Sequence, residues 1–286
     1  MCMGLGCNAV GVTGSRIIEE KRERLPAILT NSFVPCNGRL PALLALSAFL
    51  YSGDQTGKDA SLVGACILLL FILLGVLMTF AVSLLLSRTL LKGESSPFLL
   101  ELPPFRKPQI LKVLLKSVWE RTVRVLGRAV CTAAPAGLVL WLLAHLHTPD
   151  GSALLSCLTA FLDPFARWFG MDGTILAGFL LGFPANEIVL PVIAMAYSAQ
   201  NAAGAGNLPG SEFLLSAQFL TQNGWTRTTV LCTALFFLMH WPCATTLLTI
   251  RKETDSLRWT FAAFLIPTFC GLTVCFLVNL ISAAVF

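Results

Sequence analysis

Runs of apolar residues without any charge alternate with short polar segments along this chain of 286 residues. Asp, Glu, Lys and Arg are absent from residues 60–87, 129–149, 228–250 and 260–286. A helix needs about 20 apolar residues to cross a hydrocarbon core of about 30 Å, and each run reaches that length. The pattern predicts an all-α, polytopic transmembrane helical protein.

Two more apolar segments are interrupted by residues that end helices. Residues 25–53 contain two prolines within residues 35–41, and residues 174–197 contain Gly-Phe-Pro-Ala-Asn-Glu over residues 182–187. Proline removes a backbone donor, and unwound backbone at membrane depth is tolerated only where protein or a cavity covers it. We expect a broken helix over residues 25–53. Residues 174–197 either re-enter on one side, or cross and return through a short segment near residues 213–226.

Basic residues gather in residues 16–24, 88–128 and 251–258, which the positive-inside rule places in the cytoplasm. The acidic or neutral segments 54–59 and 150–172 then lie outside. This topology explains the net charge of +5 without a nucleic-acid partner. With 56% hydrophobic residues, 12% charged residues and a mean hydropathy of +0.77, the chain lacks the polar surface of a soluble domain. We therefore expect a multi-pass protein embedded in a lipid bilayer.

The basic segment 88–128 has a second pattern. From residue 109 onward, apolar residues such as Ile110 and Leu114 alternate at helical spacing with Lys112 and Lys116. This pattern predicts an amphipathic helix that lies on the cytoplasmic lipid surface. The alternative is a docking face for a partner protein.

A weak internal repeat divides the chain. Residues 6–10 resemble residues 182–186, and each is followed later by a Pro-Cys pair, at Pro35 and at Pro242. Interrupted hydrophobic segments in two halves of a transporter indicate a binding site near the membrane midplane. We divide the chain into a partial first gate motif with its broken helix (1–53), a central membrane region with the cytoplasmic basic segment (54–172), and a second gate region (173–286).

Five motifs occur in order along the chain. They are Gly-Leu-Gly-Cys-Asn-Ala-Val-Gly-Val-Thr-Gly (4–14), Ser-Phe-Val-Pro-Cys-Asn-Gly-Arg-Leu-Pro (32–41), Glu-Leu-Pro-Pro-Phe-Arg (101–106), Gly-Phe-Pro-Ala-Asn-Glu-Ile-Val (182–189) and His-Trp-Pro-Cys (240–243). Together they resemble the membrane part of the bacterial ferrous iron transport protein B (FeoB) family. The resemblance implies Fe²⁺ transport across the bacterial cytoplasmic (inner) membrane through broken or re-entrant gate helices.

The same family has an N-terminal GTP-binding domain and further membrane helices. This sequence contains no Gly-x-x-x-x-Gly-Lys-Ser/Thr phosphate loop, so we expect the chain to bind no nucleotide and to be no enzyme. Its first gate motif begins at Gly4, close to Met1. We expect a truncated or split permease, with the GTPase and the N-terminal helices on a separate polypeptide. Assembly as a homo-oligomer stays open.

Candidate ligands for Fe²⁺ follow from the residue types in the gate motifs. A carboxylate at membrane depth is costly unless it faces a polar cavity or a partner, and three cysteines adjoin Asn, Pro or Gly, where backbone carbonyls can be free. Thiolate, imidazole and carboxylate groups all suit this borderline metal. The candidates are Cys7, Glu187, Cys243, Cys36 and His240.

Each candidate has a structural alternative. Glu187 is also expected as the partner of Arg39 in an ion pair, and His240 as a histidine bonded to a carbonyl. The cysteines are also expected as packing residues within helices. Asn8 and Asn186 are expected to bind freed backbone groups rather than metal.

Two other functions remain open at this stage. One is transport of a different solute such as a nucleoside, since related gate repeats are associated with nucleosides. The other is a scaffold or regulatory subunit that does not transport and serves a complete homologue. Intact site residues favour transport, whereas missing helices favour the subunit.

Overall fold

A computed structural model of the chain describes residues 2–18, 20–51, 58–89, 123–146, 154–201 and 217–285, together with positions 111, 115 and 119. Every element in these ranges is helical. Three stretches of the described part, residues 62–89, 227–254 and 257–284, are long and apolar enough to cross a membrane. The predicted all-α membrane fold is confirmed.

The first apolar segment folds as a broken helix. The chain starts with η1 (Cys2–Leu5), α1 (Asn8–Gly14) and η2 (Ser15–Ile17). It continues through α2 (Lys21–Thr30), η3 (Asn31–Phe33) and α3 (Leu40–Tyr51). Pro35 lies between η3 and α3, where it cannot donate the backbone hydrogen bond that a continuous helix requires. The predicted interruption of residues 25–53 is confirmed.

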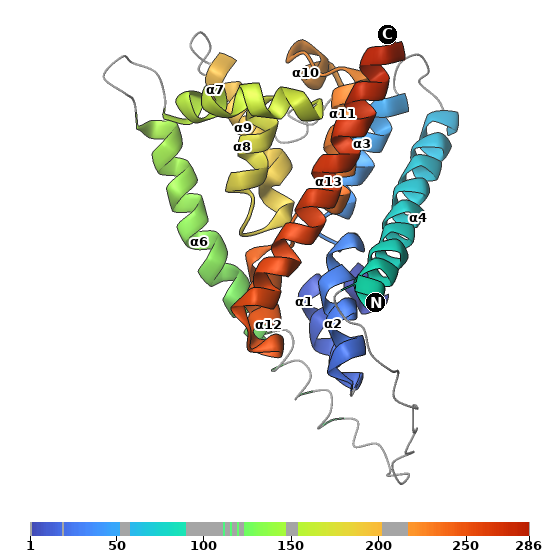
Figure 1. The fold of residues 1–286 in the computed structure, drawn as a ribbon. Coiled ribbons are helices and arrows are strands. Elements are labelled where there is room, and N and C mark those ends of the chain that lie inside the picture. Colours follow the sequence, from blue (N-terminus) through green and yellow to red (C-terminus); the bar gives the residue numbers. More distant parts are fainter. Residues whose placement is uncertain are drawn as a thin grey trace.

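Two long helices flank the fold, α4 (Lys58–Thr89) and α6 (Arg124–His145). After α6 the chain forms α7 (Leu154–Ala166) and η5 (Arg167–Phe169). Figure 1 shows α7 lying across the upper end of the molecule, where it packs against the following helix, α8 (Gly173–Leu181). Gly173 permits this contact, because a Cβ there would lie 2.0 Å from the backbone oxygen of Thr159.

The second interrupted segment re-enters the fold on one side. α8 runs from the upper end toward the middle, and after a turn the chain forms η6 (Asn186–Ile188) and α9 (Val189–Asn201), which returns beside α8 (Figure 1). The helices approach closely at Gly178, where a Cβ would lie 2.2 Å from Cγ1 of Ile193. Of the two paths expected for residues 174–197, the structure has the re-entrant one.

The last part of the chain crosses the fold twice. α10 (Ala217–Gln222) lies at the upper end and is followed by α11 (Arg227–Met239), α12 (Ala244–Thr254) and α13 (Leu257–Val285). The apolar run 228–250 is therefore not one regular helix, because residues 240–243 separate α11 from α12. Pro242 lies in this interruption, as Pro35 does in the first.

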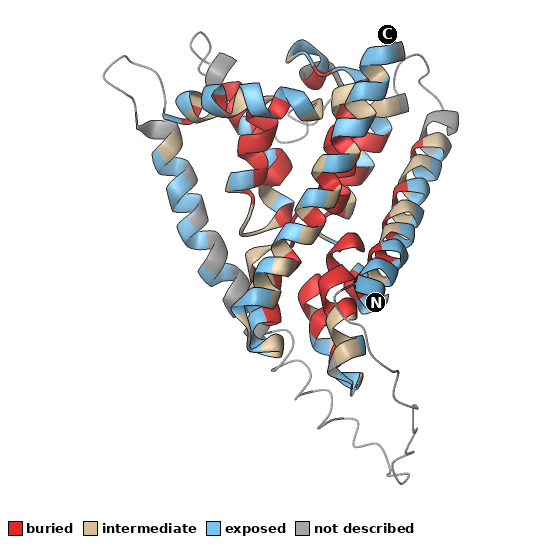
Figure 2. Ribbon diagram, in the orientation of Figure 1, coloured by how far each residue is buried: buried red, intermediate tan, exposed pale blue. Residues whose placement is uncertain are grey.

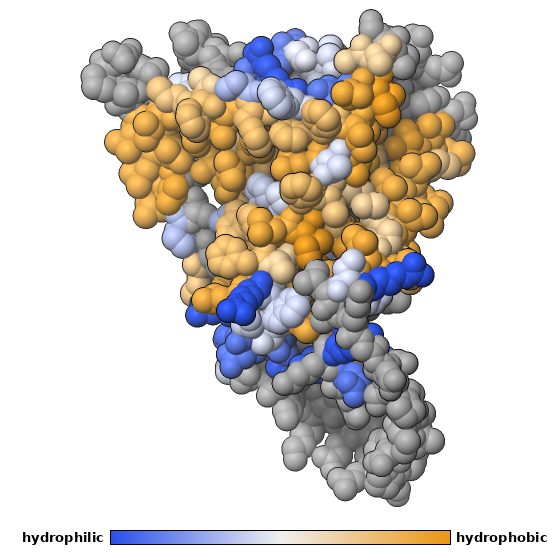
Figure 3. All heavy atoms as spheres, in the orientation of Figure 1, coloured by the Kyte–Doolittle hydropathy of each residue, from blue (hydrophilic) through white to orange (hydrophobic). Residues whose placement is uncertain are grey.

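Burial is concentrated on the short helices rather than on the long ones. Figure 2 shows buried residues gathered on α8, α9, α11 and the segment around η3, while α4, α6 and α13 carry many exposed residues. The exposed side chains on these long helices are large and apolar, for example Leu70, Leu138 and Phe269. Figure 3 shows apolar residues across the broad middle of the molecule and hydrophilic residues near both edges. This distribution suits helices that face hydrocarbon on the outside.

The basic segments meet at one end of the molecule. α1, α2, α12, the last turn of α4 and the first turn of α6 lie at the lower end in Figure 1, which we call the inner end. The opposite end, with α7 and α10, we call the outer end. Most of the basic segment 88–128, including the amphipathic helix predicted from residue 109 and the motif over residues 101–106, lies outside the described residues.

Candidate functional site

Two broken helices, one formed by η3 and α3 and the other by α11 and α12, have their breaks close together in the middle of the fold. α3, the second half of the first broken helix, packs against α11, and α12 packs against α1. The turn of the re-entrant hairpin reaches the same region, because the backbone N–H of Ala244 donates to the carbonyl of Phe183 at 3.1 Å. Three stretches of irregular backbone, residues 34–39, 182–185 and 240–243, therefore form one centre, which we call the central junction.

Arg39 holds the central junction together. Its side chain is fully buried, and its guanidinium donates to the carbonyl of Ser32 at 2.8 Å on one broken helix. On the other, it donates to the carbonyls of Leu238, His240 and Trp241 at 3.0, 3.2 and 3.0 Å. The carbonyl of Leu238 is free because residue 242, its normal helical partner, is a proline. Arg39 thus replaces the backbone donors that the interruptions remove.

This role corrects one expectation for Arg39. The ion pairs between described residues are Arg16–Glu253 and Arg167–Asp163, so Arg39 and Glu187 do not pair. The planar fork of a guanidinium is suited to several carbonyls at once, and four of them share its charge here. The ion pair with Arg39, which was the structural role expected for Glu187 as an alternative to metal binding, is therefore not formed.

Glu187 lies against the first broken helix. It belongs to η6, is exposed, and its side chain covers Gly38, where an added Cβ would lie 2.8 Å from Cγ and 2.9 Å from Oε1 of Glu187. Gly38 is therefore the residue that lets this carboxylate approach the backbone of the junction. The contact joins the second gate motif to the first.

His240 is enclosed by aromatic rings and bonded on both ring nitrogens. It is 1% exposed, with Phe179, Phe236, Phe237 and Trp241 around it. Nδ1 lies 2.9 Å from the carbonyl of Phe237, and Nε2 lies 3.2 Å from Oδ1 of Asn186. A carbonyl oxygen can only accept, so Nδ1 donates to Phe237, and Nε2 contacts the side-chain amide of Asn186. The carbonyl bond is the structural alternative expected for His240.

Two of the candidate cysteines begin short helices at the junction. Cys7 is the N-cap of α1 and Cys243 is the N-cap of α12, and neither side chain makes a capping hydrogen bond. The thiol of Cys243 lies 3.2 Å from the hydroxyl of Thr246. Cys36 and Cys243 both lie close enough to Arg39 to interact with its charge. All three cysteines are partly exposed, unlike Cys232 and Cys275, which are buried between α11 and α13.

The five predicted ligands thus surround the junction without forming one coordination sphere. Within the part of the chain that the structure describes, no group of three Cys, His, Asp or Glu side chains is arranged to hold a metal ion. Pairs of groups are near each other, such as Cys36 and Cys243 beside Arg39. Such an arrangement can offer an ion one or two side chains at a time, together with backbone carbonyls.

The asparagines stabilise irregular backbone, partly as expected. The amide nitrogen of Asn31 donates to the carbonyl of Asn8 at 2.8 Å. With its own amide nitrogen as donor, Asn8 reaches the carbonyls of Val34 and Gly4 at 3.3 and 3.1 Å. Asn186 differs, because its amide contacts the His240 ring rather than backbone. These Asn31 and Asn186 contacts could not be predicted from the sequence, which shows only that amides stand beside interruptions.

A polar network at the outer end fixes the start of the re-entrant hairpin. Asp172 caps α8 through the N–H of Ile175 at 2.7 Å and accepts a hydrogen bond from the Tyr197 hydroxyl of α9. That hydroxyl accepts from the indole of Trp225 at 3.0 Å. Burial raises the pKa of the Asp172 carboxyl, and the bonds from Tyr197 and Ile175 oppose that shift. The hairpin is therefore anchored at its outer end while its turn reaches the junction.

Comparison with known families identifies two segments of the chain. Residues 68–121 match the family model described as ferrous iron transport protein B C terminus. Residues 126–257 match the Gate family model, described as nucleoside recognition. No solved structure matches the chain.

Curated relatives are similar over nearly the whole chain. An Fe(2+) transporter FeoB of Staphylococcus aureus (strain MSSA476) is 32% identical over 275 residues, which are 93% of this chain and 38% of the relative. Fe(2+) transporters FeoB of Methanocaldococcus jannaschii and Leptospira interrogans are 26% and 27% identical over 92% and 95% of this chain. The chain spans 38% and 41% of their lengths.

Proposed function

This chain combines the C-terminal membrane domain of the ferrous iron transport protein B family with a gate domain, and from that premise we propose that it forms the ion path for Fe²⁺ across the bacterial cytoplasmic membrane. The observation that carries the proposal is the central junction, where two broken helices and a re-entrant hairpin meet. Irregular backbone at membrane depth persists only where protein covers it or where it lines a path. Transporters use such interruptions as binding sites near the midplane.

The residues proposed to line the path are the five predicted ligands, Cys7, Cys36, Glu187, His240 and Cys243. Glu187 supplies a carboxylate beside Gly38, and Cys243 with Thr246 supplies a thiol and a hydroxyl. Carboxylate, thiol and imidazole all suit Fe²⁺. Transport requires binding that is favourable enough to enter and weak enough to leave. Arg39 contributes to that balance, because a buried positive charge beside the path weakens the hold on a divalent cation.

We assign the inner end to the cytoplasm, because the last turn of α4 and α12 lie there and carry the basic residues Arg88 and Arg251. We further propose that the chain itself binds no nucleotide and is not an enzyme. We propose that the GTPase that would drive or regulate transport lies outside the residues of this sequence. Its position would be at the inner end, where the basic segments lie.

The test is uptake of radioactive Fe²⁺ by cells that lack other ferrous transport, with any required partner expressed. Glu187→Gln keeps the shape of the side chain and removes its charge, so we expect uptake to fall by about tenfold or more, as for loss of a charged group at an ion site. Cys66→Ala on the exposed face of α4 is the matched control and should leave uptake nearly unchanged. Equal uptake by the wild type and the Glu187 variant, at matched expression, would remove Glu187 from the mechanism.

A nucleoside is the second candidate substrate, and one observation favours it. The family model that matches residues 126–257 is described as nucleoside recognition. If cells take up labelled nucleosides in a saturable way, and no Fe²⁺ enters with any partner supplied, the substrate is a nucleoside. Failure to transport either substrate, combined with stimulation of a complete homologue, would assign the chain as a regulatory subunit.

A further inference from the structure

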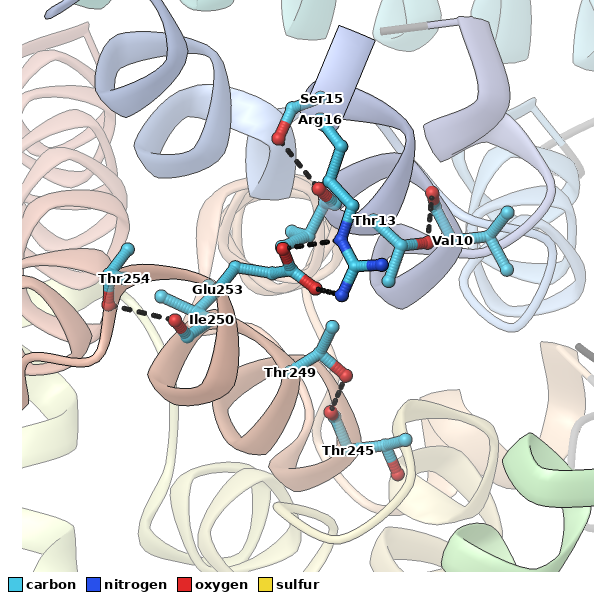
Figure 4. Close-up of polar contacts among 10 residues, drawn as sticks. Val10, Thr13, Ser15, Arg16, Thr245, Thr249, Ile250, Glu253 and Thr254 are labelled. Carbon is cyan, nitrogen blue, oxygen red and sulfur yellow. Dashed lines mark hydrogen bonds and ion pairs between the residues drawn. The ribbon is translucent and has the colours of Figure 1, made fainter. Parts of the chain in front are cut away.

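An ion pair at the inner end joins the two gate regions. Arg16, at the end of the first gate motif, donates from Nε to Oε2 of Glu253 at 2.8 Å and from Nη2 to Oε1 at 2.7 Å (Figure 4). The two residues are separated by 237 positions in the chain. Both carboxylate oxygens are engaged, so this is the bidentate geometry of a strong arginine–carboxylate contact.

The exposure of the two partners is strongly unequal. The Arg16 side chain is 69% exposed, whereas that of Glu253 is 8% exposed. Arg16 therefore lies over the carboxylate and separates it from the aqueous phase at the inner end. Glu253 lies in the last turn of α12, where the helix dipole disfavours a negative charge, and Arg16 offsets that unfavourable position.

Glu253 terminates a line of polar side chains on α12. Cys243, Thr246, Thr249 and Glu253 follow one another at intervals of three or four residues, which places them along one side of the helix. Thr246 and Thr249 are buried at 1% and 3% exposure, and α12 packs against α1. The line begins at the central junction and ends at the ion pair. We call the contact between α1 and α12 the inner seam.

We propose that the inner seam is the exit half of the path and that the Arg16–Glu253 pair is its gate on the cytoplasmic side. This inference rests on the proposed transport function and adds a closing element to it. In the closed state Arg16 covers the end of the seam and neutralises Glu253. When Arg16 moves into water, the seam opens and Glu253 becomes an accessible carboxylate at the exit.

The chemistry of the pair suits a gate. Arg16 is already 69% exposed, so it moves into water without leaving a buried position, and opening costs less than breaking a fully buried pair. A divalent cation at the end of the seam competes with Arg16 for the same carboxylate. The pair is also the only ion pair between separate gate regions among the described residues, because Arg167–Asp163 is local to one turn.

The experiment measures access to Cys243 and does not require iron. The full chain is prepared with Cys243 as its sole cysteine, the other nine of ten being replaced. Inside-out vesicles are treated with a membrane-impermeant maleimide, which approaches Cys243 only from the cytoplasmic side. R16E and E253R each place like charges together and should raise the labelling rate about fivefold. The double variant R16E/E253R restores the pair and should return the rate to that of the parent.

The local pair at the outer end provides the matched control. R167E and D163R should leave the rate of Cys243 labelling unchanged, because that pair lies on α7 and η5, far from the inner end. The proposal is overturned if all variants label at the parental rate, or if the double variant labels as fast as the single ones. The same charge variants are then tested for Fe²⁺ uptake in the chain with all its cysteines. If all variants label at the same rate but Fe²⁺ uptake depends on Glu187, the gate proposal is wrong and the transport proposal stands. If labelling follows the expected pattern but no Fe²⁺ is taken up, Fe²⁺ is the wrong substrate and the gate proposal stands.

Discussion

Arg39 shows at the scale of one residue how a buried charge can be a structural element. Removing a guanidinium from water is expensive, and the geometry must return hydrogen bonds to offset that cost. Four carbonyls from two broken helices provide them. The sequence placed Arg39 in an interruption and suggested an ion pair with Glu187 only as the structural alternative for that carboxylate. Complementary charge is visible in a sequence, whereas carbonyls freed by a distant proline are not.

Replacing Arg39 should therefore destabilise the junction more than removal of a surface charge would. Arg39→Met leaves four carbonyls without their donor, and we expect a loss of about 3–5 kcal/mol in the free energy of unfolding, because each buried acceptor left unsatisfied costs about 1–3 kcal/mol. Arg39→Lys should recover only part of this, because an ammonium cannot reproduce the planar fork. The control Arg167→Met removes an exposed ion pair and should cost no more than about 1 kcal/mol. Denaturation in detergent micelles, followed by tryptophan fluorescence, measures all three.

The roles of the other site residues stay predictions, and only their neighbours in the fold can be compared with the sequence. Their motifs were recognisable because Pro, Gly and Asn beside isolated polar groups in an apolar run are unusual. Their partners were not, since the Glu187–Gly38 contact joins the two gate regions and the Asn186–His240 contact joins residues 54 positions apart. The Arg16–Glu253 pair had no sequence signal, because both residues stand in ordinary charged segments.

At the scale of helices, two spans break at a proline, whereas α6 and α13 continue through Pro135 and Pro267. The break within residues 25–53 was predicted from the sequence, but residues 228–250 were expected to form one span. Pro35 and Pro242 each lie in an interruption, and each broken helix presents freed carbonyls to the same guanidinium. The path of residues 174–197 could not be chosen in advance. Its length and apolar character suit either a crossing or a hairpin. The structure decides through close packing, with Gly178 against Ile193 and Asp172 bonded to Tyr197.

α4 packs closely on the break between η3 and α3, and Gly75 lies at this contact. A Cβ at Gly75 would lie 2.7 Å from the backbone oxygen of Phe33 and 3.2 Å from Cδ1 of Leu238. Because a backbone oxygen cannot rotate away, Gly75→Ala should push α4 outward and cost about 1–3 kcal/mol, the usual range for overpacking. Gly137→Ala on α6 is the control, since its Cβ would meet no atom within 4 Å. If the Gly75 variant unfolds at the same temperature as the Gly137 variant, α4 does not pack on the break between η3 and α3.

At the scale of the whole molecule, composition and hydrophobic runs were sufficient to predict a helical membrane protein. They also placed the basic segments at one end, where the structure has α1, α2 and α12. They could not show that a short α1 and a broken helix near the other end of the chain share a seam. That arrangement depends on tertiary packing, which links the first gate region to the second. The proposed path consequently belongs to the assembled fold and to no single motif.

The last prediction concerns what the chain does by itself. It spans 38% of the Staphylococcus aureus relative, and its long helices expose large apolar side chains around the fold. In a bilayer, helix association depends on packing and interhelical hydrogen bonds, so surfaces on these helices are available to further helices of an assembled transporter.

We expect the purified chain in liposomes to pass Fe²⁺ no faster than liposomes without protein, and to bind no GTP. Addition of a polypeptide that carries the GTPase and the remaining helices of the family should produce saturable uptake, which Glu187→Gln abolishes. Saturable, Glu187-dependent uptake by the chain without any partner would contradict this expectation and show that 286 residues, alone or as a homo-oligomer, make a working path.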